Sequence, residues 1–205
     1  ALDDNQGLSG NVQRLKAMTQ LEVLYLEGNM FDGNIDGILE AMPKLVEFDI
    51  SDNMIDGNIP LALFDHKALV VVDMHNNAFA GELPNDNSKN TNLQFLALHE
   101  NLLTGNIPHR IRHLETILHL DLSFNRFVGI IPDNLGTLTQ LRYLQISGNN
   151  FTSQTMQDID FSQLTNLREL AMKDNNLKGT LPDWLGEFTD LQLLDLDANQ
   201  LTGEI

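Results

Sequence analysis

The segment LDLSFNRFVGIIP, from Leu120 to Pro132, decides the fold of this chain. It opens with apolar residues at alternate positions and reaches an asparagine at Asn125. Alternation with a period of two is typical of a β-strand that turns every second side chain to one face. Gly129 permits a tight bend, and Pro132, with its fixed φ and no amide hydrogen, suits the first position of a helical turn. The segment therefore predicts a short strand, a bend and a turn of helix.

The same pattern recurs along the chain. The motif apolar-x-x-apolar-x-apolar-x-x-Asn begins eight times, with a spacing of 24 residues that lengthens once to 26. The eight starts are Leu21, Leu45, Leu69, Leu93, Ile117, Leu141, Leu167 and Leu191. Such a period indicates a solenoid, because each strand is too short to be stable alone and must pair with the strand of the next coil.

Each motif ends on an asparagine. An amide side chain both donates and accepts hydrogen bonds, so it can satisfy backbone groups where the strand turns away. We expect these residues to form a structural ladder from coil to coil. The ladder asparagines are Asn29, Asn53, Asn77, Asn101, Asn125, Asn149, Asn175 and Asn199.

The motif resembles the plant-type subclass of leucine-rich repeats, L-x-x-L-x-L-x-x-N-x-L-x-G-x-I-P, which residues 120–132 follow almost position for position. The resemblance covers essentially the whole chain. It implies an α/β leucine-rich repeat solenoid, a right-handed superhelix with short parallel strands on the concave face and 3₁₀ or short helices and loops on the convex face. It also implies a second short sheet around the Leu-x-Gly-x-Ile-Pro segments.

We expect one domain over residues 1–205, with a partial unit at 1–20 and an incomplete last repeat from residue 191. Because both ends fall within a repeat, we expect a fragment of a longer protein; self-association through uncapped coil ends is the alternative. Two repeats depart from the pattern. The sixth is two residues longer, which predicts a bulged loop over residues 153–160. Asn87 and Asn90 replace apolar anchors, which predicts a loop, with His66 packed beside Asn90.

Composition excludes several classes of function. The chain has 12 Lys and Arg against 29 Asp and Glu, a net charge of −17, which argues against a nucleic acid or an anionic membrane surface as partner. It has no cysteine, which excludes disulfides, thiolate metal sites and cysteine nucleophiles. No apolar run approaches a membrane span. No nucleophile elbow, phosphate-binding glycine loop or metalloprotease helix is present, so we expect neither an enzyme nor a cofactor.

The outward positions of successive strands form columns on the concave face. One column is apolar and aromatic and is a candidate for binding anchors; the alternative is that its members only pack on each other across strands. A second column brings His75 beside His99, but neighbours on a rigid sheet rarely converge on a metal, so we expect no metal site. The candidate ligand-binding residues are Val71, Asp73, His75, Phe95, His99, His119, Asp121, Phe124 and Tyr143.

Acidic residues are concentrated in the first three and last two copies of the repeat. They would steer a cationic peptide or protein, although a solvated face that maintains solubility explains them equally well. Family members are usually ectodomains of receptor-like kinases or secreted inhibitor and defence proteins. The resemblance thus implies a non-enzymatic protein or peptide recognition module, outside the cell or tethered as an ectodomain, in signalling; the lack of cysteine leaves a cytoplasmic location open.

Two alternative functions are a structural or self-associating repeat segment and a carbohydrate-binding surface that uses Phe95 and Tyr143. Ice binding would favour a regular ladder of threonines. The column before the glycine mixes Asp32, Ala80, Thr104 and Lys178, so it is no such ladder. One glycosylation sequon, Asn150-Phe151-Thr152, makes Asn150 a possible acceptor.

Overall fold

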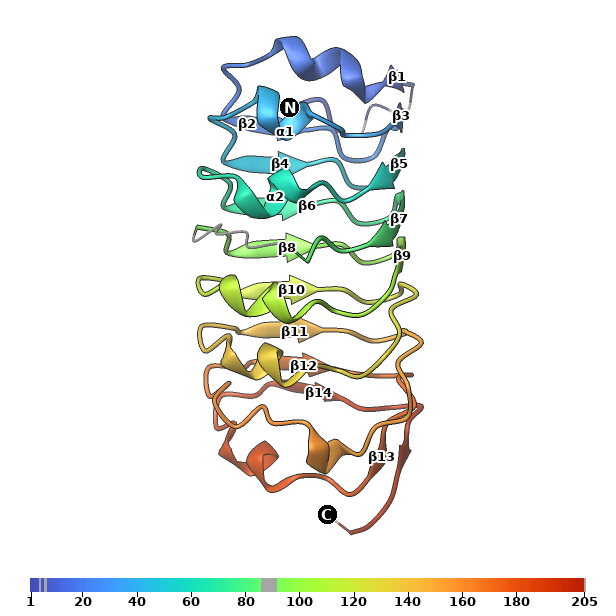
Figure 1. Cartoon of the computed structure of the whole chain (residues 1–205), viewed down its shortest axis with the longest axis vertical. Helices are drawn as coiled ribbons and strands as arrows, with labels where there is room; N and C mark the ends of the chain where they lie inside the picture. Colours follow the sequence, from blue (N-terminus) through green and yellow to red (C-terminus); the bar gives the residue numbers. More distant parts are fainter. Residues whose placement is uncertain (4, 6, 86–91, 205) are drawn as a thin grey trace.

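The chain winds into a stack of coils that runs along one axis from the N-terminal to the C-terminal end (Figure 1). The structure is a computed structural model that describes residues 1–3, 5, 7–85 and 92–204. The expected loop at Asn87 and Asn90 and the terminal Ile205 lie outside these described residues. The predicted solenoid is confirmed.

The main sheet has eight parallel strands, one from each repeat, and each strand pairs with those of the coils before and after it. Each strand is three residues long. The strands are β2 (Val23–Tyr25), β4 (Glu47–Asp49), β6 (Val71–Asp73), β8 (Phe95–Ala97), β10 (His119–Asp121), β11 (Tyr143–Gln145), β12 (Glu169–Ala171) and β14 (Leu193–Asp195).

A second, five-stranded parallel sheet lies along one side of the stack, as the family resemblance implied. Its strands are β1 (Ser9–Asn11), β3 (Met30–Gly33), β5 (Met54–Asn58), β7 (Ala78–Glu82) and β9 (Leu102–Thr104). A separate pair, β13 (Lys178–Gly179) and β15 (Gln200–Leu201), forms a two-stranded sheet towards the C-terminal end.

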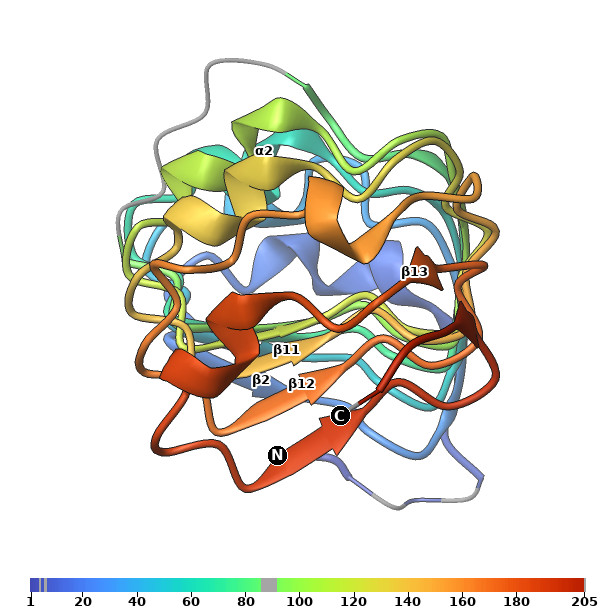
Figure 2. The ribbon, with the colours of Figure 1, turned by 90° about the horizontal axis from the view of Figure 1, so that it is seen from below.

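Short helices cover the side of the stack opposite the main sheet, which Figure 2 shows in a view along the axis. Two are α-helices, α1 (Ile38–Ala41) and α2 (Leu61–Asp65). The others are 3₁₀ helices at Val12–Ala17, His109–His113, Asp133–Thr137, Met156–Asp158 and Asp183–Glu187. Proline stands immediately before α2 and three of the 3₁₀ helices, the positions for which its fixed φ and missing amide hydrogen suit it.

The core lies between the main sheet and the helices. The middle residue of each strand points inward, and Phe48, Val72 and Leu120 have no exposed surface. Two residues after the ladder asparagine stands a phenylalanine in four coils; it is buried at Phe79, Phe127 and Phe151 and partly buried at Phe31. The inward residues of every coil thus join one continuous apolar core.

The asparagine ladder ties each coil to its neighbours. The Asn125 Nδ2 donates to the carbonyl oxygens of Leu98, Leu122 and Ser123 at 2.9, 3.3 and 3.1 Å. Its Oδ1 accepts the Leu103 backbone N–H at 3.0 Å. Asn53, Asn77, Asn101 and Asn149 repeat this arrangement, so the predicted ladder is confirmed at these positions.

The longer sixth repeat changes the ladder locally. In a regular coil the ladder Oδ1 accepts a backbone N–H that follows the preceding ladder asparagine, as Asn125 does with Leu103. In the longer repeat the Asn175 Oδ1 accepts the backbone N–H of the preceding ladder asparagine itself, Asn149. Asn176 donates instead to the Phe151 carbonyl oxygen at 3.1 Å. The predicted bulged loop contains a short 3₁₀ helix, and its Met156 is fully buried. The extra length is therefore anchored in the core.

His66 is a core histidine. It is 8% exposed, its Nδ1 accepts the Leu69 backbone N–H at 3.2 Å, and its Nε2 faces the Met42 carbonyl oxygen at 3.0 Å. With Nδ1 as acceptor, Nε2 must carry the proton and donate. The histidine thus satisfies backbone groups of two coils; its predicted neighbour Asn90 lies outside the described residues.

Replacement of a ladder asparagine should cost far more stability than replacement of an exposed one. Asn125→Ala removes four hydrogen bonds from buried backbone groups and should lower the free energy of unfolding by about 3 kcal/mol. Asn150→Ala is the matched control, because Asn150 is exposed and its side chain makes no hydrogen bond to the described residues; we expect a change below about 0.5 kcal/mol. Urea unfolding followed by circular dichroism measures both, and equal midpoints would contradict the ladder.

Candidate ligand-binding surface

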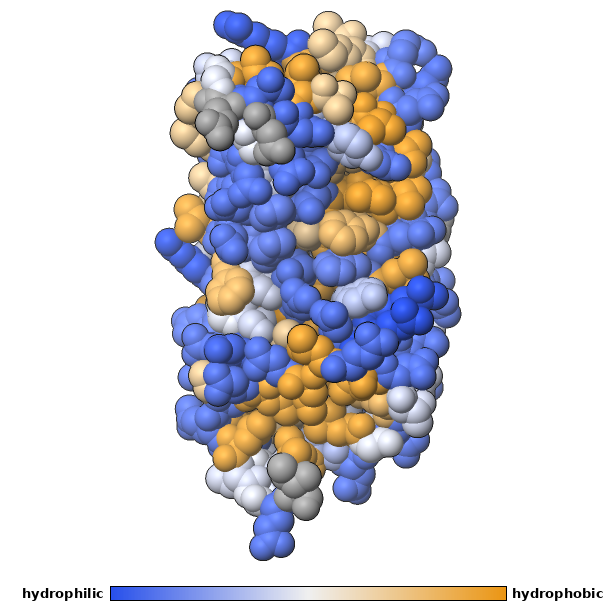
Figure 3. Space-filling model, turned by 180° about the vertical axis from the view of Figure 1, so that it is seen from behind, coloured by the Kyte–Doolittle hydropathy of each residue, from blue (hydrophilic) through white to orange (hydrophobic). Residues whose placement is uncertain are grey.

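The strand face, meaning the outward side of the main sheet, carries the candidate residues. Register places Phe95, His119 and Tyr143 side by side on β8, β10 and β11, with Val71 next to Phe95 on β6. Figure 3 shows this face: hydrophilic surface covers much of it, broken by apolar patches, with a large one near the C-terminal end. Leu193, at an outward position of β14, is 43% exposed.

The rings of Phe95, His119 and Tyr143 form an aromatic row. Phe95 and His119 are stacked, with centroids 4.4 Å apart and planes 17° apart. The His119 and Tyr143 rings are 5.5 Å apart and tilted by 37°. All three residues are half-buried. Because the rings cover one another's faces, the row presents mainly ring edges outward, and the predicted packing across strands is present.

His119 is held in its neutral form within the aromatic row. Burial lowers the pKa of its imidazole, and this outweighs the opposing effect of the nearby Asp121, Asp73 and Glu169 carboxylates. At neutral pH the row is therefore uncharged.

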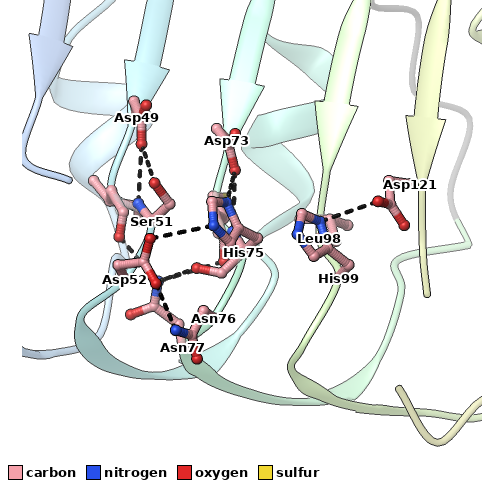
Figure 4. Close-up of polar contacts among 12 residues, drawn as sticks. Asp49, Ser51, Asp52, Asp73, His75, Asn76, Asn77, Leu98, His99 and Asp121 are labelled. Carbon is pink, nitrogen blue, oxygen red and sulfur yellow. Dashed lines mark hydrogen bonds and ion pairs between the residues drawn. The ribbon is translucent and has the colours of Figure 1, made fainter. Parts of the chain in front are cut away.

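A second pair of histidines lies on the same face in a charged environment. The rings of His75 and His99 are stacked, 4.4 Å apart with planes only 6° apart. Figure 4 shows His75 between two carboxylates: its Nδ1 lies 2.7 Å from Asp73 Oδ1 and its Nε2 lies 3.3 Å from Asp52 Oδ2. The Nδ1 of His99 lies 3.2 Å from Asp121 Oδ2. We call His75, His99, Asp52, Asp73 and Asp121 the histidine–aspartate cluster.

The cluster places a positive charge on His75. The hydrogen bond to Asp73 raises its pKa to about 9; burial opposes this rise, and the charges of Asp73, Asp52 and Asp49 add to it. His75 is therefore protonated at neutral pH: its Nδ1–H donates to Asp73 Oδ1, and its Nε2 forms an ion pair with Asp52. The strand face thus holds two histidine environments that shift the pKa in opposite directions: the apolar one lowers it at His119, and the ionic one raises it at His75.

The aspartates of the central column hold the backbone as well as the histidines. The Oδ1 atoms of Asp49, Asp73 and Asp121 each accept the backbone N–H two residues further on, at Ser51, His75 and Ser123. Asp121 was expected to contact ligand, but its side chain is only 7% exposed. Its Oδ1 accepts the Ser123 backbone N–H and its Oδ2 lies 3.2 Å from His99 Nδ1, so little of the carboxylate faces solvent. Direct contact between Asp121 and a ligand stays a prediction.

Phe124 is the most exposed aromatic side chain of the strand face, at 57%. It lies at the bend after β10 with a φ of 51°, in the left-handed region. A Cβ atom on Gly148 of the next coil would stand 2.6 Å from the Phe124 Cδ1, so the ring lies against a glycine that leaves room for it. Among the described residues, no ring contact links Phe124 to the aromatic row.

Three further observations bear on the sequence-based predictions. Over residues 1–3, 5, 7–85 and 92–204, no group of three or more histidine or carboxylate side chains is arranged to hold a metal ion.

Asn150 is exposed while Phe151 is 1% exposed, so glycosylation at Asn150 stays a prediction. The candidate ligand-binding residues predicted from the sequence did not include Asp52 and Gly148, although each lies about one repeat length from the side chain it contacts, His75 and Phe124.

Comparisons with known proteins agree with this geometry. The sequence profile of the Leucine Rich Repeat family matches residues 116–138 and 166–188. The crystal structure of the Arabidopsis receptor kinase HAESA, in complex with the peptide hormone IDA and the co-receptor SERK1, is 32% identical and has a TM-score of 0.87 over 96% of this chain. The chain therefore contains leucine-rich repeats, as its motif predicts.

Two other solved structures are similar over nearly the whole chain. The PEPR1–AtPEP1 structure is 30% identical, with a TM-score of 0.85 over 98% of this chain. A plant ice-binding protein is 27% identical, with a TM-score of 0.83 over 99% of this chain and 64% of its own. This chain spans 33% of the HAESA chain and 28% of the PEPR1 chain, about a third of each. No curated protein sequence matches it.

In the part of the chain that the structure describes, the helices are all too short, or too polar, to cross a bilayer.

The stability of this leucine-rich repeat chain should fall as pH rises through the titration of His75. The pKa is about 9 in the folded chain against an ordinary value of 6.5, so between these values the folded state keeps a proton that the unfolded state has lost. The stabilisation is complete below about pH 6.5 and is lost as pH approaches 9. Urea titrations from pH 6 to 9.5 should show this decline.

His75→Gln should flatten the decline, whereas His109→Gln should keep it, because His109 is exposed on the helical side of the stack. A His75→Gln variant with the same slope as the unaltered chain would refute the ionic role of His75.

Proposed function

We propose that this chain is a peptide- or protein-recognition module and that its strand face binds an extended segment carrying positive charge. We further propose that it forms the extracellular ligand-binding part of a receptor-like or secreted protein. The observation that carries the proposal is the uncharged aromatic row set in a face rich in carboxylates. Aromatic side chains in a concave or sheet surface are common binding anchors, and surrounding charges steer the partner.

The similar structures support this assignment. The HAESA structure contains a peptide hormone, IDA, and PEPR1 was solved with AtPEP1. Both resemble this chain over at least 96% of its length. The shared architecture offers a rigid sheet on which side chains of successive coils are spaced by about 4.8 Å, so one extended peptide that lies across the strands contacts side chains of several coils.

The charge of the strand face favours a cationic partner. Carboxylates of the first coils, among them Glu22 and Asp52, lie on or beside this face, and among the described residues Asp52 forms an ion pair with His75 alone. Towards the other end Lys173 pairs with Asp197 at 2.9 Å, and both side chains are largely exposed. With a net charge of −17, the chain should attract basic peptides at a distance, more so at low ionic strength.

The geometry disfavours the carbohydrate alternative. Aromatic residues hold sugars against a free ring face, and the faces of Phe95 and His119 lie against each other at 4.4 Å. The plant ice-binding structure shares the fold of this chain but does not make ice binding its favoured function. Exposed positions on the side of the second sheet include the charged residues Asp32, Asp56 and Lys178, so they form no regular ladder of threonines. Self-association through the coil ends would not involve the strand face. Substitutions on the strand face therefore distinguish self-association from peptide binding.

Truncation of Phe95 and Tyr143 in the aromatic row should weaken peptide binding. Peptides selected from a random 12-residue display library on the immobilised chain should be enriched in lysine and arginine, and their affinity should fall with salt. The double variant Phe95→Ala, Tyr143→Ala should weaken a selected peptide at least about tenfold, by loss of two central contacts. Isothermal titration calorimetry measures this.

The control is the double variant Val128→Ala, Ile130→Ala, which removes exposed apolar surface outside the strand face; these residues are 37% and 58% exposed. Selected peptides that bind both variants equally well would refute the assignment of the strand face.

A further inference from the structure

Phe124 combines two unfavourable properties. Its ring is 57% exposed to water, and its backbone φ of 51° lies in the region where a Cβ atom clashes with the backbone. For a bulky residue this conformation is an outlier, and strain of this kind concentrates at functional sites. Nothing in the fold requires a phenylalanine here, because the ring contributes little to the core.

The corresponding position of the other coils shows which residues the bend prefers. It is the residue before the ladder asparagine, and its φ lies between 47° and 67° in each coil. Glycine, aspartate and asparagine, which tolerate this region best, occupy five of the eight positions. The occupants are Gly28, Asp52, Asn76, Glu100, Phe124, Gly148, Asp174 and Ala198. Phe124 is thus the one large apolar side chain in this set.

The neighbours of Phe124 along the stack differ on its two sides. The backbone N–H of Glu100 donates to Ser123 O at 3.1 Å, and that of Phe124 donates to Ser147 O at 2.8 Å, so the three bends lie in consecutive coils. On one side Gly148 leaves space that the ring occupies. On the other side Glu100 is exposed, and its carboxylate has no ion pair with any described residue.

We propose that Phe124 and Glu100 form a subsite for an arginine side chain of the bound peptide, with the guanidinium stacked on the phenyl ring and paired with the carboxylate. This inference rests on the proposed function of the strand face as a peptide-binding surface. Arginine fits better than lysine, because its planar guanidinium stacks on aromatic rings and offers a fork of donors to a carboxylate. The subsite selects among cationic partners that the acidic face attracts.

The test compares fluorescently labelled hexa-arginine and hexalysine by fluorescence anisotropy at about 0.15 M salt, where steering by distant charges is screened. The unaltered chain should bind hexa-arginine about fivefold more tightly than hexalysine. Phe124→Ala should remove this preference and leave hexalysine binding unchanged. Glu100→Gln should weaken both peptides. Ile130→Ala is the matched control, an equally exposed apolar residue at 58%, and should keep the preference.

A second variant separates recognition from folding. Phe124→Gly should unfold at the same temperature as the unaltered chain or higher, since glycine adopts this φ without strain. A lower unfolding temperature would show that the ring supports the bend, which would overturn the inference.

The inference is also overturned if the unaltered chain shows no preference for hexa-arginine, or if Phe124→Ala keeps it. Should this happen while the Phe95 and Tyr143 double variant still loses its selected peptides, the subsite fails and the proposed function stands. If neither set of variants changes binding, both fail.

Discussion

The amide of each ladder asparagine spans two coils, and the rest of the molecule depends on this bridge. In the regular coils its Nδ2 donates to carbonyl oxygens at the end of its own strand and of the strand before it, as Asn125 does with Leu122 and Leu98. In the longer repeat Asn175 donates to Ile146 of the preceding coil. These backbone groups are buried and would otherwise lack partners. Because the same bridge recurs, consecutive strands stay in register, and outward side chains one repeat apart become lateral neighbours.

Register then decides the chemistry of the strand face. His75 and His119 are the same residue type on one sheet, yet they occupy opposite environments. Carboxylates on both sides of His75 raise its pKa, whereas burial between Phe95 and Tyr143 lowers that of His119. Ionic and apolar strips therefore run side by side across a few strands, a combination suited to a partner with both charged and apolar side chains.

The ladder also imposes a cost. To aim its amide at two coils, the chain bends at the preceding residue into a positive φ, which suits Gly148 but strains Phe124. Elsewhere the bend holds small or polar residues or an acidic side chain, and the structure needs nothing more there. A repeat scaffold that satisfies its own backbone in this way is free to vary its outward residues, and departures from the preferred residue type stand out against the repetition.

The solenoid, its inward residues, the asparagine ladder and the columns of the strand face can all be predicted from the amino-acid sequence. All of these follow from a period of 24 residues, and a repeated local pattern needs no knowledge of distant contacts. The depth and direction of each outward side chain emerge only in the folded chain. There Asp121 lies beside His99 with 7% of its side chain exposed, the faces of Phe95 and His119 lie against each other, and Asp52 pairs with His75. These outcomes depend on rotamers and on packing between coils, which side chains from two or three neighbouring strands set together.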